Sequence, residues 1–145
     1  MVDDQEQNLA ELKLEKAIDE RLDEVVLLAE NRVEKAKQQS VGSGSLRVID
    51  KIQPAQLRNA ATVASQTTTS YLTVKNWIRY QVGRSNSPWP RELAEGVIDD
   101  TQQLNTIATE ISNSLAGSQV AAVHIRLVRL YIGYLIRAFT YAKKR

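Results

Sequence analysis

Apolar residues recur every three or four positions along the first 40 residues of the chain. No glycine or proline interrupts the segment from about residue 6 to residue 39. The apolar stripe consists of Ile18, Leu22, Val25, Ala29, Val33 and Ala36. This spacing predicts one long amphipathic helix. Its seam is rich in alanine, so we expect it to need another helix or another protein to pack against.

A run of small residues, SVGSGS at residues 40–45, ends this periodicity. Glycine and serine neither propagate a helix nor pack into a core. The sequence therefore predicts three parts: an acidic amphipathic helix over residues 1–40, a linker over 41–51 and a bundle core over 52–145. One interpretation of the first part is an extension of the core.

Residues typical of helix ends then mark two further helices. Pro54 suits the first turn of a helix that continues to about residue 65, because the missing N–H of proline would be unpaired there anyway. Ser70 can cap the next helix, predicted over residues 71–82. We expect Gly83 to end that helix in the left-handed conformation.

Two longer helices are predicted in the second half of the chain. Pro90 opens one of them and Gly117 ends it, and the last helix runs from about residue 119 to residue 143. Only 6 Gly and 3 Pro are left for turns in 145 residues. The whole pattern predicts an all-α fold, a helical bundle of about five helices with a long amphipathic N-terminal helix.

The last helix is the most apolar, and its length raises the question of a membrane span. Arginines within it argue against one, because each would cost about 2.5 to 3.5 kcal/mol near a bilayer centre. At helical spacing the polar positions form one stripe, made of Arg126, Arg129, Gly133, Arg137, Thr140 and Lys144. We therefore expect the central helix of a bundle, with one edge open to solvent or to a partner, and no membrane association.

Charge is distributed unevenly along the chain. Residues 1–40 hold 11 Asp+Glu and 6 Lys+Arg, a balance of −5, and the totals of 17 and 19 leave 6 and 13 for residues 41–145, a balance of +7. A basic helical unit of this size indicates a polyanionic partner or serves solubility alone. With 0 Cys and no secretory pattern at the start, a cytoplasmic location is the default expectation.

Few residues are suited to catalysis or metal binding. His124 is the only histidine, and a packed or interface role is favoured over that of a base. Asp99 and Asp100 are adjacent, so they do not face each other on a helix, and a solvated surface is the better interpretation. We expect no enzyme, no metal and no cofactor. A small ribonuclease that uses Tyr80 or His124 is the weakest alternative.

Basic and aromatic residues are interleaved in the stretch WIRYQVGR, residues 77–84. Lys75 and Arg79 lie four apart on one face of the same predicted helix, with Arg84 nearby. Guanidinium groups can grip phosphates while aromatic faces pack on sugars or bases. The alternative is that Trp77 and Tyr80 are core residues and the basic face is only solvated.

Three segments in this order resemble the small all-helical subunit of type III CRISPR effector complexes of the Csm kind. They are IQPAQLRNAATVA, YLTVKNWIRYQVGR and RLVRLYIGYLIRAFTYAKK, and the resemblance covers roughly residues 52–144. The matching positions are Gln56, Leu57 and Arg58 in the first segment, Tyr80, Gly83 and Arg84 in the second, and, loosely, Tyr141 and Lys143 in the third.

The resemblance implies a non-catalytic subunit that stacks in a filament with copies of itself and with other subunits. In such a complex the basic residues hold the backbone of guide RNA and target RNA without reading sequence. By the resemblance, Arg58, Arg79 and Arg84 are the first candidates. The basic helix face and the charge stripe complete the set: Arg58, Lys75, Arg79, Arg84, Arg126, Arg129 and Arg137.

Other interpretations stay open at this point. A helical adaptor or scaffold module without RNA contact would use the thin first helix to dock on another protein and the arginines in salt bridges. Arg58 and Arg84 could instead satisfy carbonyl groups near helix ends. The acidic first helix has no counterpart in the family core. It could pack on a neighbouring subunit or cover the basic surface in the absence of RNA.

Overall fold

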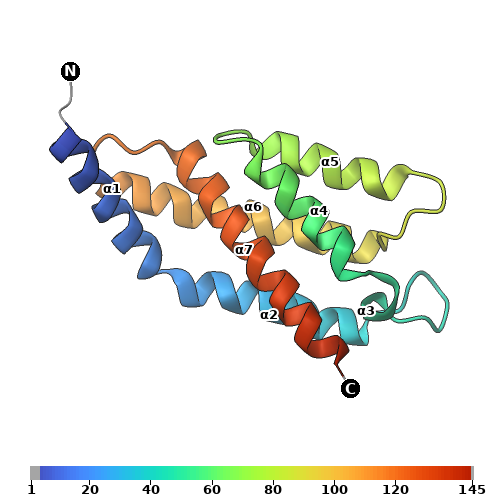
Figure 1. Ribbon diagram of the computed structural model, residues 1–145. Coiled ribbons are helices and arrows are strands. Elements are labelled where there is room, and N and C mark those ends of the chain that lie inside the picture. Colours follow the sequence, from blue (N-terminus) through green and yellow to red (C-terminus); the bar gives the residue numbers. More distant parts are fainter. Residues whose placement is uncertain (1–3, 145) are drawn as a thin grey trace.

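The computed structural model describes residues 4–144, and they form seven α-helices (Figure 1). The helices are α1 (Asp4–Asp19), α2 (Leu22–Gln38), α3 (Val48–Lys51), α4 (Pro54–Ser65), α5 (Tyr71–Gly83), α6 (Arg91–Ser114) and α7 (Val120–Lys143). The all-α prediction is confirmed. The number of helices is seven rather than about five, because the first predicted helix is broken and a one-turn helix follows it.

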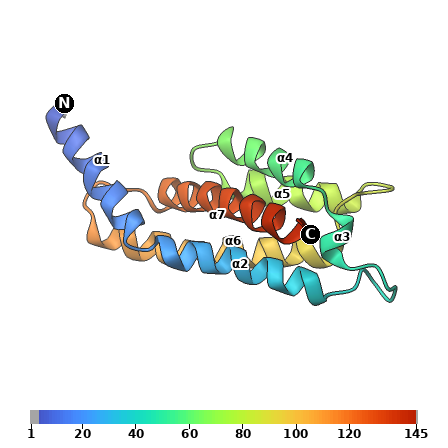
Figure 2. The ribbon, with the colours of Figure 1, turned by 60° about the horizontal axis from the view of Figure 1, so that its bottom comes forward.

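Helix α7 is the central element of the bundle. It packs along α2, α4 and α6, and both views place it between α2 and α4 (Figures 1 and 2). Its apolar side supplies the large, fully buried side chains of Leu127, Tyr131, Leu135 and Phe139. The same core includes α2 residues such as Val25 and α6 residues such as Leu104.

The prediction of a single long N-terminal helix is wrong, because the chain bends between α1 and α2. Arg21 leaves helical geometry with φ −110° and ψ 4°, although no glycine or proline is present. Its guanidinium contacts Glu24 at 2.9 Å and Glu110 of α6 at 2.7 Å. The bend lets α2 follow the bundle while α1 projects from it (Figure 2). Among the described residues of α1, only Ile18 is buried.

Residues 41–51 hold more structure than a flexible linker would. Ser40 and Arg47 form an isolated antiparallel bridge, and α3 follows at once. Val48 and Ile49 are buried in the common core. The proposed domain boundaries stay a prediction; in the structure α2 and α3 contribute buried residues to the same hydrophobic core as α4–α7.

Most helix ends agree with the sequence. Pro54 lies in the first turn of α4, and the Ser70 hydroxyl accepts a hydrogen bond from the Thr73 N–H. The expectation for Gly83 is wrong, because Gly83 is the last residue of α5 and the chain leaves the helix extended at Arg84. The left-handed residue of this turn is Asn86, with φ 56°.

Candidate nucleic-acid interface

Four of the predicted RNA-binding residues lie on α4 and α5. Arg58, Arg79 and Arg84 are exposed, and Lys75 is half-buried. Arg58 points outward because its neighbour Leu57 faces the core together with Ala60. Within residues 4–144, none of these four side chains forms an ion pair. Their positive charges are therefore available to an anionic partner.

The two aromatic residues of the stretch 77–84 have different roles. Trp77 is half-buried and packs edge to face on the buried Trp89, with ring centroids 6.0 Å apart. Tyr80 is 55% exposed, and the Arg84 guanidinium carbon lies 5.9 Å from the centre of its ring. Trp77 is thus part of the fold, whereas Tyr80 and Arg84 present a cation–aromatic pair to solvent.

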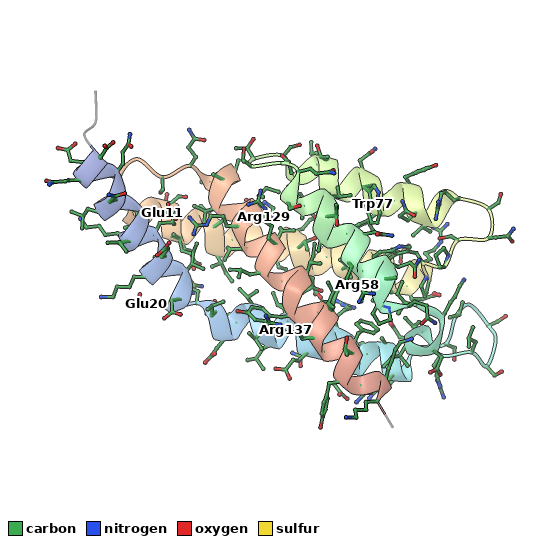
Figure 3. All side chains as sticks on the ribbon, viewed as in Figure 1. Glu11, Glu20, Arg58, Trp77, Arg129 and Arg137 are labelled. Carbon is green, nitrogen blue, oxygen red and sulfur yellow. The ribbon has the colours of Figure 1, made fainter. Side chains whose placement is uncertain are left out.

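The three arginines of α7 lie in different environments (Figure 3). Arg126 is paired with Glu11 of α1, with 2.7 Å between Nη1 and Oε1. Arg129 donates to the carbonyl oxygen of Ala64 at 2.9 Å and to that of Thr67. It thereby satisfies carbonyls at the C-terminal end of α4, which favours a structural role for Arg129 over an RNA contact. The exposed Arg137 lies over the Tyr134 ring at 5.7 Å.

A buried ionic cluster that the sequence did not reveal links α2, α6 and α7. Arg32 donates to both carboxylate oxygens of Asp100, each at 2.9 Å, and the Tyr131 hydroxyl donates to Oδ2 of Asp100 at 2.5 Å. Arg32 is 8% exposed and Asp100 4%. The expectation of a solvated surface is therefore wrong for Asp100 and holds only for the exposed Asp99.

Gly96 makes room for this cluster on α6. A Cβ built on Gly96 would lie 2.5 Å from Cζ of Arg32 and closer still to its Nη1. The guanidinium thus occupies the volume that any other side chain at position 96 would need. This close approach explains a glycine in the middle of a helix, where it is otherwise unfavourable.

Electrostatics fix the protonation states of the cluster. The hydrogen bond to Asp100 raises the pKa of Arg32, against the effect of burial. Burial is the main cause that raises the pKa of Tyr131 well above its usual value, with the nearby carboxylate adding to it. Tyr131 therefore keeps its proton and donates a hydrogen bond. The charged groups of the cluster are one guanidinium and one carboxylate.

His124 lies on the inner side of α7, as the preference for a packed histidine predicted. Its side chain is buried, and Nε2 lies 2.7 Å from the carbonyl oxygen of Thr101, so Nε2 carries the proton. The ring is 4.6 Å from that of Tyr71, centre to centre. Burial lowers the pKa of His124, and the hydrogen bond to Thr101 opposes this only in part.

We expect the protein to lose stability as the pH falls through the ordinary titration range of histidine. The unfolded chain takes up a proton near pH 6.5, whereas the folded chain resists it because the pKa of His124 is lowered. The stabilising effect of the neutral His124 is complete above about pH 6.5. It is lost as the pH falls toward the lowered pKa of His124 in the folded chain. Thermal unfolding at pH 7.5 and pH 5.5 measures it. His124→Gln removes the only histidine and should flatten this dependence; an equal fall in the variant would contradict the assignment.

The described residues also bear on metal and membrane association. In residues 4–144 no three His, Asp or Glu side chains come together in a way that could hold a metal ion. Within the same range no helix combines the length and the apolarity that crossing a bilayer requires.

Comparison of the chain with family models, with curated proteins and with solved structures finds no match. The resemblance to the CRISPR subunit therefore stays a prediction that rests on the three sequence segments quoted above.

Proposed function

We propose that the protein is a non-catalytic, cytoplasmic RNA-binding subunit of a type III CRISPR effector complex. The observation that carries the proposal is the set of basic side chains on α4 and α5 that form no ion pair within residues 4–144: Arg58, Lys75, Arg79 and Arg84. They contact the phosphates of guide and target RNA. Because phosphates are the same at every nucleotide, this contact positions the RNA without reading its sequence.

The arginines of α7 contribute unequally to this surface. Arg137 is exposed, but it lies between α7 and α2, on the side of α7 opposite to α4, so an RNA would have to cross α7 to reach it. Arg126 contributes only when Glu11 of α1 releases it, and Arg129 supports the surface by holding the end of α4. Since α1 is acidic and only lightly attached, RNA can displace it from Arg126 at small cost. The acidic segment thus covers part of the basic surface until RNA arrives.

Neutralising three exposed arginines should weaken RNA binding by about tenfold or more at moderate salt. The variant is Arg58→Gln, Arg79→Gln, Arg84→Gln. The slope of log affinity against log salt should fall in magnitude by about 2 to 3, one for each lost phosphate contact. Binding of a fluorescent single-stranded RNA and of an RNA duplex, titrated over a salt series, measures both effects.

A matched control removes the same charge from the other side of the molecule. Lys13, Lys16 and Lys35 are exposed residues of α1 and α2, and their replacement by glutamine should change the RNA affinity and the salt slope much less. The proposal fails if both triple variants weaken binding equally, because binding would then report net charge alone.

A helical adaptor module is the second candidate, and the outer side of α1 favours it. Leu9 is 53% exposed and Leu12 61%, and they lie one turn apart on the projecting helix. Such a pair is suited to pack against another protein, including another subunit or a second copy of this chain. Absence of salt-dependent RNA binding in the intact chain would leave this function as the better account.

A further inference from the structure

A groove of about 490 Å³ runs between α2 and α7. Its walls include Leu27, Glu30 and Asn31 of α2 and Tyr134, Arg137 and Tyr141 of α7. Tyr141 is 83% exposed and Leu27 56%, so large apolar surfaces face solvent across the groove. Figure 1 places α2 and α4 on opposite sides of α7, so the groove between α2 and α7 lies away from α4, the helix that carries Arg58.

A second recess of about 400 Å³ continues this groove toward the end of α7. The two share Lys37 and Ala142. The second recess gathers the cationic side chains of Lys37, Arg47 and Lys143 around one carboxylate, Asp50. Lys37 also lines the first groove, so the two cavities together hold four cationic side chains and three carboxylates, a formal charge of +1, with the excess positive charge in the second recess.

Each part of this double site matches one part of a nucleotide. Tyr141 and the stacked pair of Tyr134 and Arg137 offer flat faces for a base. Glu30 offers a carboxylate that only accepts hydrogen bonds, which suits the adjacent N–H donors of guanine. Glu34 is already paired with Lys37 at 2.9 Å. The net positive recess next to the groove suits the phosphate.

We propose that the groove between α2 and α7 binds one nucleotide, with the base against Tyr134 and Tyr141 and the phosphate in the recess of Lys37, Arg47 and Lys143. Guanine is the preferred base. The nucleotide is either free or an unpaired nucleotide of a single RNA strand. The second case rests on the proposed function and extends it, because the strand would cross α7 from the surface of α4 and α5.

A docked protein helix fits these observations less well. An apolar helix would cover Leu27 and Tyr141, but it would also bury the charged side chains of Glu30 and Arg137 and the net positive recess beside them. A nucleotide has an aromatic base that can pack in the groove and a negatively charged phosphate that can bind in the adjoining recess.

The test is a calorimetric titration of the intact protein with three ligands: guanosine 5′-monophosphate, guanosine and a short single-stranded oligoribonucleotide. Tyr141→Ala should weaken the binding of the nucleotide by about tenfold. Lys143→Gln should weaken the binding of the monophosphate, because one of the three cations of the recess is lost, and leave the binding of guanosine unchanged. The matched control is Tyr80→Ala, an exposed tyrosine outside the groove, which should have no effect on the monophosphate.

The two ligand sources give different results. A free nucleotide as the natural ligand predicts tighter binding of the monophosphate than of the oligonucleotide per site, and an RNA strand predicts the reverse; both support the site. Binding that does not depend on Tyr141, or no saturable binding of either probe, overturns it. So does a Tyr141→Ala variant that changes only self-association in sedimentation, because a second copy would then occupy the groove.

The inference and the proposed function can fail separately. The triple variant at Arg58, Arg79 and Arg84 should leave monophosphate binding unchanged. Loss of long-RNA binding in that variant, together with no monophosphate binding in the intact protein, would keep the proposed function and remove only the nucleotide site.

Discussion

Asp100→Ala is expected to destabilise the protein by about 3 to 5 kcal/mol. The substitution removes the carboxylate that pairs with Arg32, which is 8% exposed, and the acceptor of the Tyr131 hydroxyl. Arg32 cannot shed its proton, so an uncompensated guanidinium stays in the core or draws water into it. Denaturant unfolding monitored by circular dichroism measures the loss, which is a large part of the stability of a single domain.

The neighbouring aspartate provides the control for this experiment. Asp99→Ala removes the same atoms from the same helix. Because Asp99 is exposed, the free energy of unfolding should change by no more than about 0.5 kcal/mol. Replacing the whole cluster by Arg32→Met, Asp100→Leu and Tyr131→Phe should recover much of the stability, because no polar group is then left unpaired. Equal effects at positions 99 and 100 would contradict the buried pair.

Gly96→Ala is expected to destabilise the protein by about 2 kcal/mol, although alanine is the better helix former by about 1 kcal/mol. The new methyl group would occupy the place of the Arg32 guanidinium, which its two hydrogen bonds to Asp100 hold in position. Arg32 would have to move and break them. The measurement is the same denaturant unfolding.

A second helical glycine predicts the opposite sign. A Cβ on Gly133 of α7 would meet nothing within 4 Å, so Gly133→Ala should stabilise the protein by about 0.5 to 1 kcal/mol.

The control for Gly96→Ala is the same substitution in an Arg32→Ala background. The loss of stability caused by Gly96→Ala should disappear there, because the obstructing guanidinium is gone. If Gly96→Ala were still harmful there, the clash with Arg32 would not be its cause.

The fold was largely predictable because apolar spacing determines which side of each helix is buried. The stripe through Val25, Ala29 and Val33 is buried as expected, and the ends marked by Pro54 and Ser70 agree with the structure. The bend at Arg21 was not predictable from local sequence. At the bend Arg21 contacts Glu110, which is 89 positions away along the chain.

The buried cluster left a signal in the same periodicity. Arg32 lies between Ala29 and Ala36 at helical spacing, and Asp100 lies between Val97 and Leu104. A charge inside an apolar stripe on each of two helices favours a buried pair, but only the structure shows that α2 and α6 lie close enough to form it.

The role of Arg129 had no such signal. Its partners are carbonyl groups of Ala64 and Thr67, and every residue carries a carbonyl. Knowing that Arg129 serves the end of α4 requires the packing of α4 on α7. The remaining candidates on α4 and α5 could be selected from their charge and spacing alone, and their contact with RNA stays a prediction.

The position of α7 has a consequence for synthesis of the chain. The helix that α2, α4 and α6 all pack against follows the three of them along the chain, so it leaves the ribosome after them. Until it emerges, the nascent chain exposes the apolar stripes of three helices without their common partner, which is a state prone to aggregation and to capture by chaperones. The bundle therefore closes only after α7 has emerged, and a chain terminated within α7 lacks the helix on which the others pack.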